Sequence, residues 1–195
     1  MEKLIRIPMF PLSIFPLPGE LVPLHIFEPR YRQLLEDAET RDISFGIFFN
    51  HISNIEKLGS SVKLESVIKR YPGGESDIIV KCSDLFEMNT MLRSYSDKLY
   101  PGGEVHFWNV DLTETVRQKL ADAFVEYLSM IKISRHSTEF SAYHIATELS
   151  LDYEERLKFV RMDVAKKESF LLTRLKYQKQ LLAHANSAKD IFHLN

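Results

Sequence analysis

The sequence predicts an α+β fold, with a β-rich barrel lobe over residues 1–112 and a helical lobe packed on it over residues 113–195. Six of the eight prolines lie between Pro8 and Pro29, and prolines at this density keep a chain extended. Up to about residue 112 the apolar side chains alternate with period two, as in strands, and beyond it they recur at helical spacing. Because no Gly/Ser-rich linker separates the two regions, we expect a rigid body with two lobes.

The first helix is expected at the end of the proline-rich block, where FPLPGELVPLHIFEPRYRQLLEDAE covers residues 15–39. Proline is tolerated in the first turn of a helix, so the helix begins at Pro29 or Arg30. The apolar residues that follow at helical spacing are Tyr31, Leu34, Leu35 and Ala38.

The strands come next. Residues 43–49 alternate in the manner of a half-buried strand, and residues 105–110 carry large apolar side chains on both faces. A strand covered on both sides favours a sheet that curls into a small barrel. The pentapeptide YPGGE occurs at residues 71–75 and again at 100–104, and both copies have the pattern of a type II turn.

About four helices are expected in the second lobe. The first follows Asp111 and Glu114, which are spaced as a capping box, and the third follows a second such pair, Asp152 and Glu155. The apolar stripes of the four helices cover residues 116–131, 140–149, 157–160 and 164–182.

The early part of the chain resembles the N-terminal, substrate-binding domain of Lon proteases. Pro8 to Leu12, Pro18-Gly19 and Pro23 to Tyr31 carry the resemblance, and the order of the later strands is similar. It implies a PUA-like pseudo-barrel and non-catalytic recognition of polypeptide by a stand-alone member without the ATPase and peptidase modules. Where this family usually has a glycine and an Arg-Phe pair, the chain has Cys82, Leu85 and Phe86, so no role of that arginine is carried over.

The composition of the chain limits which binding partners and which cellular compartment we expect. Residues 1–112 hold 12 basic and 16 acidic side chains, and neither lobe has a dense basic run, so nucleic acid is not the expected partner. The single cysteine excludes an intramolecular disulfide and fits a reducing compartment. Arg6, Pro8 and Pro11 interrupt the N-terminus before it reaches the length of a signal peptide. We therefore expect a cytoplasmic protein with no membrane partner.

The sequence indicates no catalytic residues, cofactor or metal. None of the seven glycines is followed by lysine, so no Walker A loop is present. Ser-x-x-Lys occurs three times, at residues 60–63, 66–69 and 129–132, but a working dyad needs a buried lysine, and these fall on expected solvated faces. His144 and Glu148 are spaced as an ion pair on a helix surface, which we favour over a metal site.

A binding surface remains. The candidates for an exposed apolar patch that contacts polypeptide are Phe15, Leu17, Leu21, Phe48 and Trp108. The proline-rich loop is expected not to enter a ladder fully, and an open barrel edge could accept an extended chain.

The remaining motif residues are interpreted as structural. His25 is expected to satisfy buried backbone groups, while Glu28 and Arg30 pin the extended segment to the barrel. The full set is Pro18, Gly19, Pro23, His25, Phe27, Glu28, Pro29, Arg30 and Tyr31.

The favoured function is binding of unfolded or extended polypeptide, either as an adaptor for a separate AAA+ protease or as a holdase-like module. One alternative is RNA binding, because PUA-like barrels elsewhere serve RNA, although the acidic first lobe argues against it. A second alternative is an enzyme that depends on a small molecule and uses a cleft between the lobes.

Overall fold

The computed structural model describes residues 4–134 and 139–192, with side chains up to Ala185. The chain divides into two compact units, residues 1–111 and residues 112–195. Each unit is described by itself.

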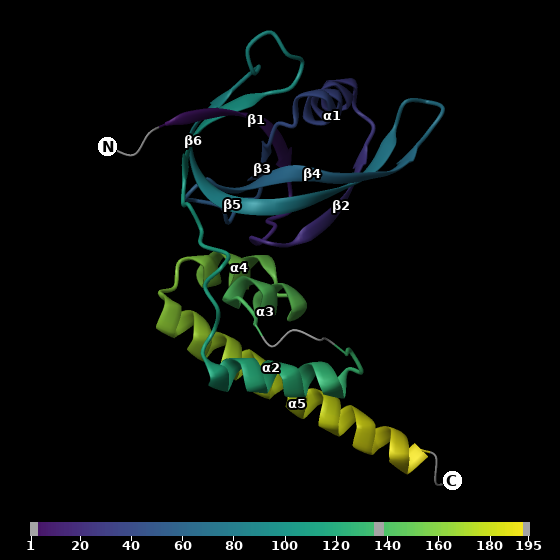
Figure 1. Ribbon diagram of the computed structural model, residues 1–195, viewed down its shortest axis with the longest axis vertical. Coiled ribbons are helices and arrows are strands. Elements are labelled where there is room, and N and C mark those ends of the chain that lie inside the picture. Colours follow the sequence, from purple (N-terminus) through teal and green to yellow (C-terminus); the bar gives the residue numbers. More distant parts are fainter. Residues whose placement is uncertain (1–3, 135–138, 193–195) are drawn as a thin grey trace. The chain divides into compact units, whose positions relative to one another are not determined.

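The first unit is a closed barrel with one extra strand (Figure 1). The sheet order is β2-β5-β4-β3-β1-β6, and a further pairing between β5 and β6 joins the sheet into a ring of five strands. The pairing of β1 with β3 is parallel and the others are antiparallel. The elements are β1 (Ile5–Leu12), β2 (Leu21–Ile26), α1 (Pro29–Arg41), β3 (Phe45–Phe49), β4 (Leu58–Arg70), β5 (Ser76–Leu92) and β6 (Gly102–Phe107). The expected α+β fold with a β-rich barrel is confirmed.

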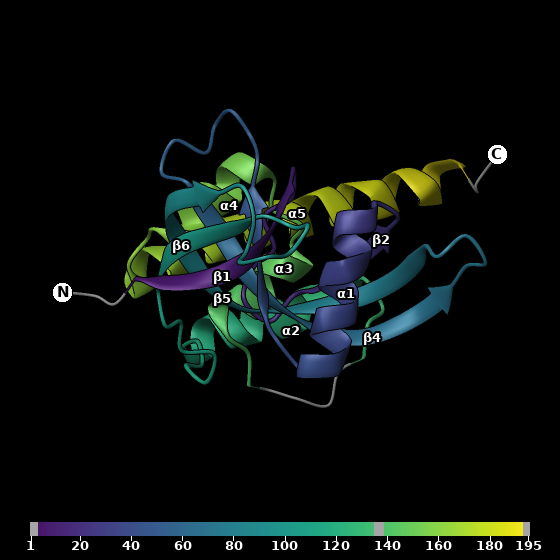
Figure 2. The same ribbon diagram turned by 90° about the horizontal axis from the view of Figure 1, so that it is seen from above.

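Helix α1 begins at Pro29, as the sequence predicts, and packs against β2 and β4 (Figure 2). Its apolar stripe, which includes Tyr31, Leu34 and Leu35, shares a core cluster with Ile78 and Val80 of β5. A second cluster includes Met9, Phe86 and Val105, from the three strands β1, β5 and β6. Beyond α1 the β4–β5 hairpin extends outward to its YPGGE turn (Figure 2).

The first copy of YPGGE is a turn closed by the bond from the Gly74 N–H to the Tyr71 carbonyl, but not the expected type II turn, because the positive φ lies at Gly74 rather than at Gly73. The second copy is not a turn, contrary to our expectation. Tyr100 is buried, and the two glycines after Pro101 are the first residues of β6. A Cβ on Gly103 would lie 2.5 Å from the Met9 Cε atom, so a larger residue here would force the buried Met9 side chain to shift. The same five residues thus serve two purposes, because only one copy joins two adjacent strands of a hairpin.

The second unit consists of four helices over its described residues. They are α2 (Gln118–Met130), α3 (Ala142–Glu148), α4 (Tyr153–Val160) and α5 (Val164–Phe192). Helix α5 packs against each of the other three. The core contains an edge-to-face pair of Phe124 and Phe140, whose ring centroids are 4.9 Å apart. Across the described part of the chain, no helix has the length and apolar character that crossing a bilayer requires.

The N-termini of the helices confirm two of the predicted capping signals and contradict one. Asp152 and Glu155 form the expected capping box of α4, and the Asp163 carboxylate accepts the Lys166 N–H at the start of α5. The expected box at Asp111 and Glu114 is wrong, since α2 begins only at Gln118.

Candidate functional site

Two of the expected surface residues are buried. Phe15 and Leu17 lie in the segment between β1 and β2, and both are almost fully inaccessible. Polar contacts hold this segment down: the Ser60 hydroxyl donates to the Pro16 carbonyl at 2.6 Å, and the Leu17 N–H donates to the Glu20 carboxylate at 2.8 Å. Phe15 and Leu17 are therefore not part of an exposed patch, contrary to our expectation.

Two further candidates are half-buried. Phe48 packs against the cluster that contains Met9 and Phe86. Trp108 lies just beyond the end of β6 rather than within the strand. Its backbone N–H donates to the Leu85 carbonyl at 3.0 Å. Neither residue adjoins Leu21 in the strand pairing, so the five candidates do not form one surface.

Leu21 is exposed, at 56% of its surface, and it begins the edge strand β2. The expectation that the proline-rich loop does not fully enter a ladder holds for Phe15 and Leu17, which lie between β1 and β2, but is wrong for Leu21, because all six residues of β2 pair with β5. Pro23 is tolerated since β2 has β5 as its one neighbour in the sheet and needs no second set of backbone donors.

Alternate residues of β2 direct their backbone N–H and C=O groups away from β5, to the free edge of the strand. The Cys82 N–H of β5 donates to the Glu20 carbonyl at 2.9 Å, just before β2 begins. In an antiparallel ladder the direction of the backbone groups alternates, so Val22 and Leu24 bond toward β5. Leu21 and His25 then direct their N–H and C=O groups to the free side, where Pro23 offers only its carbonyl. This edge can accept the backbone of another extended chain.

One face of β2 is open to solvent along its length. Val22, Leu24 and Ile26 face the core against α1, whereas Leu21, Pro23 and His25 are exposed on the opposite face. We call the latter the outer face. The β5 residues opposite these three are Lys81, Ile79 and Asp77.

An aromatic cluster lies at the end of the outer face and consists of His25, Phe27, Tyr71 and Asp77. The Asp77 carboxylate accepts the Tyr71 hydroxyl and bonds His25 Nδ1, each at 2.6 Å. These two contacts, Tyr71 first, hold the pKa of Asp77 below its usual value, and the bond to Asp77 raises the pKa of Tyr71. The Phe27 ring stacks on His25 with centroids 6.0 Å apart.

The cluster corrects the role expected of His25, which bonds a surface carboxylate rather than buried backbone groups. Phe27, which we interpreted as a structural residue of the motif, is 57% exposed. Leu21 and Phe27 together give β2 an exposed apolar residue at each end.

Glu28 and Arg30 form an ion pair with each other at 2.8 Å. Contrary to our expectation, they do not pin the extended segment to the barrel. Arg32 does so instead, and sequence reasoning missed it. Its guanidinium donates to the Phe27 carbonyl at 2.7 Å and to the Gly73 carbonyl at 2.8 Å, which ties α1 to the tip of the β4–β5 hairpin. No local sequence pattern predicts this role of Arg32, because Arg32 and Gly73 are 41 residues apart in the sequence.

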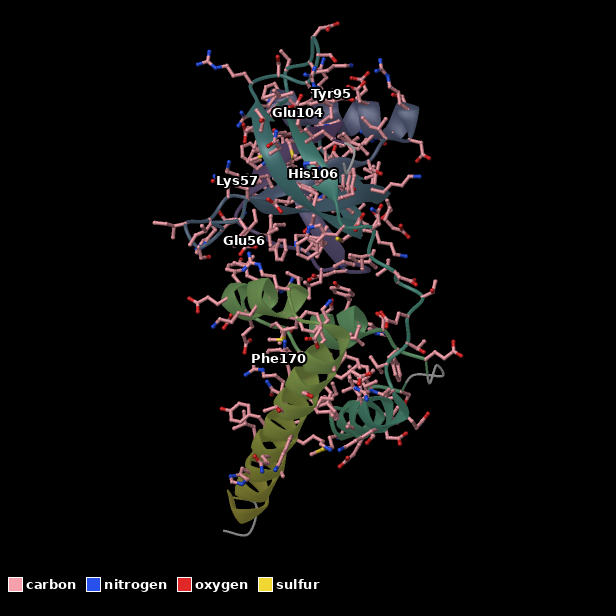
Figure 3. The ribbon with its side chains drawn as sticks, turned by 90° about the vertical axis from the view of Figure 1, so that its left-hand side faces the viewer. Glu56, Lys57, Tyr95, Glu104, His106 and Phe170 are labelled. Atoms are coloured by element: carbon pink, nitrogen blue, oxygen red, sulfur yellow. The ribbon has the colours of Figure 1, made fainter. Side chains whose placement is uncertain are left out.

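A second exposed apolar feature lies on the loop between β3 and β4, where Ile52 and Ile55 are 96% and 87% exposed. The buried Asn54 side chain braces this loop by bonding the backbone of Phe49 and Leu58. Figure 3 labels Glu56 and Lys57, the next two residues of the same loop, which stands out from the barrel.

The described residues offer little to catalysis. Ser60 donates to Pro16, and Lys63 bonds the Asp42 carboxylate at 2.7 Å, so this Ser-x-x-Lys pair has other partners. Burial raises the pKa of the Cys82 thiol, which makes it a poor nucleophile. His144 and Glu148 form the expected ion pair, at 4.0 Å, and no group of three metal-ligating side chains occurs in the part of the chain that the structure covers.

A model of the substrate-binding domain of ATP-dependent protease La (Lon) matches residues 6–181, which is most of the chain. The chain belongs to this family. The family is described as a substrate-binding domain, so the chain is a substrate-binding module of Lon type. No curated protein matches the sequence.

One solved structure shows the same fold. A Lon N-terminal domain protein from Xanthomonas campestris is similar, with a TM-score of 0.63 and 23% identity over 92% of this chain and 98% of that one. The N-terminal domain of the Lon protease of the Mycobacterium avium complex covers the same shares at 15% identity, with a TM-score of 0.48. The Lon-type fold predicted from the residues 8–31 is confirmed.

Proposed function

We propose that this Lon-type domain binds extended polypeptide along the free edge of β2 and presents it to a separate ATP-dependent protease. The observation that carries the proposal is the coincidence of an unpaired strand edge with an exposed face of the same strand that includes Leu21 and Pro23 and is followed by the exposed Phe27. Substrate binding is the property that the family description names.

Strand addition explains how such a site accepts many sequences. Main-chain hydrogen bonds to Leu21 and His25 supply affinity that does not depend on the sequence of the client. Alternate client side chains would lie on the outer face, beside Leu21, Pro23 and the Phe27 ring, where apolar side chains lose contact with water. An unfolded segment satisfies both conditions, whereas a folded protein seldom exposes a strand edge.

The role of adaptor extends this proposal. A module that holds clients needs a partner that unfolds and cleaves them, and the sequence contains no Walker A loop of its own. We place this activity in the cytoplasm, in keeping with the single cysteine.

The test compares two double variants in their binding to a reduced and alkylated, unfolded client protein. Leu21→Ser with Phe27→Ser removes two exposed apolar side chains at the ends of β2, and Ile52→Ser with Ile55→Ser removes two from the β3–β4 loop. We expect the first pair to weaken binding about tenfold or more, since each side chain contributes roughly 1 kcal/mol when half its area is buried. The second pair should bind as wild type does.

Equal losses in both variants, or no binding by the wild type, would contradict the proposal. Hydrogen exchange supplies an independent measurement, because the outward N–H of His25 should exchange quickly in the free protein and slowly with the client bound. A generic RNA that binds with steep salt dependence would favour the RNA alternative instead.

A further inference from the structure

Next to the outer face of β2, the strand β5 carries a lysine, Lys81, whose charge has no ion-pair partner on the sheet. Lys81 on β5 lies directly opposite Leu21 of β2 on one side and opposite Lys63 of β4 on the other. Its side chain is exposed, and within the described residues no carboxylate lies within ion-pair distance of it. Like charges directly opposite each other on a sheet are unfavourable.

The neighbouring acidic groups are engaged elsewhere or lie farther along the sheet. Asp42 pairs with Lys63, and the Glu20 carboxylate accepts the Leu17 N–H. Asp77 is held by Tyr71 and His25 at the other end of the outer face. Glu65 is on β4, the strand farther from β2. Lys81 is therefore an exposed cation without an ion-pair partner among the described residues, opposite Leu21 and next to an apolar stretch formed by Pro23 and Ile79.

From this arrangement we infer that the clients bound at β2 carry an acidic side chain beside Leu21 and an apolar one two residues away, beside Pro23. The inference rests on the proposed function and names its client class. A strand added to β2 lies about 10 Å from β5, two strand spacings, which a lysine and a glutamate side chain together can bridge. The period of two residues on one face places the apolar client residue over Pro23.

The test uses two synthetic ten-residue peptides of alternating Val and Thr that differ at one outer-face position, which is Glu in one and Lys in the other. Wild-type protein should bind the Glu peptide about fivefold more tightly, as for an exposed ion pair of up to about 1 kcal/mol. Lys81→Glu should reverse the preference for the Glu peptide. In 0.5 M salt the preference should disappear, because the Debye length falls to about 4 Å and an exposed ion pair is screened.

Lys57→Glu is the matched control. It makes the same change in net charge on the β3–β4 loop, where Figure 3 places Lys57, and should leave the preference for the Glu peptide in place. Reversal by both variants would show a response to net charge alone and overturn the inference. Equal binding of the two peptides to wild type would overturn it while leaving the proposed function intact. If neither peptide binds, the proposed function fails and the inference with it.

Discussion

Asp37 on α1 is a buried carboxylate with both oxygens bonded. It accepts the Tyr100 hydroxyl at 2.7 Å and pairs with Lys98 at 2.8 Å, while Arg41 lies 3.5 Å away. Tyr100 and Lys98 belong to the segment between β5 and β6, so this one side chain fixes that segment to α1. A buried charge with these partners is costly to disrupt, because its removal leaves a buried hydroxyl and an ammonium without an acceptor.

Asp37→Ala is expected to lower the free energy of unfolding by about 3 kcal/mol, as measured by urea denaturation. Asp42→Asn is the control at the C-cap of α1, since asparagine tolerates the left-handed backbone of Asp42, whose side chain is 79% exposed and whose bond to Lys63 lies in solvent. That change should cost less than about 1 kcal/mol. Similar losses in the two variants would contradict the account of Asp37.

The same carboxylate gives the first unit an acid-sensitive contact. Burial acts to raise the pKa of Asp37, but the bonds from Lys98 and Tyr100 outweigh it and the net pKa is lowered. A depressed pKa stabilises the fold above the pKa of the unfolded state, near 4, and this contribution is lost as pH falls through the lower folded value. The midpoint of thermal unfolding should therefore fall between pH 5 and pH 3 less steeply in Asp37→Asn than in wild type. Parallel profiles would rule this out.

At the scale of elements, the start of α2 is capped from another helix. Its N-cap, Arg117, makes no side-chain cap of its own. The buried Glu168 carboxylate of α5 accepts the Arg117 N–H at 2.9 Å and also bonds the guanidinium. An acceptor at the first turn satisfies a backbone donor and favours the helix dipole, so α2 and α5 depend on each other.

Glu168→Ala is expected to destabilise the second unit by about 2 kcal/mol, from the lost cap and the lost charged hydrogen bond. Glu126→Ala serves as control, because Glu126 joins the same two helices through an exposed pair with Lys179. The control should lose less than about 1 kcal/mol in urea denaturation. If the control loses as much stability as Glu168→Ala, the cap is not the source of the effect.

At the scale of the whole molecule, each of the two units has a hydrophobic core of its own. The first is built from the barrel and α1, and the second from the four helices. A domain with its own core can open without the other.

Asp37→Ala should therefore speed hydrogen exchange at amides of residues 4–111, and Glu168→Ala at amides of residues 112–134 and 139–192. Exchange measured by mass spectrometry on peptic fragments resolves the two regions. A substitution that accelerates exchange equally in both would show that the units open as one cooperative body.

Some signals confined to a few neighbouring residues predicted the structure correctly, whereas the capping pair Asp111 and Glu114 and the second YPGGE did not. Proline at the first turn marked the start of α1, and Asp152 with Glu155 marked the start of α4. The candidate site was read less well. Of five proposed contact residues, only Leu21 lies in the surface that the structure favours, whereas Phe27 was assigned a structural role.

The sequence by itself determined the α+β class, because period and proline placement act over short stretches of chain, and the resemblance of residues 8–31 to the Lon N-terminal domain indicated the type of barrel. The tertiary structure decided which residues meet solvent: that Leu17 is covered, that Phe27 is exposed and that β2 has a free edge. Those outcomes depend on contacts between residues far apart in the sequence, such as Ser60 with Pro16 and Asp77 with His25. Local patterns carry no information about such distant partners.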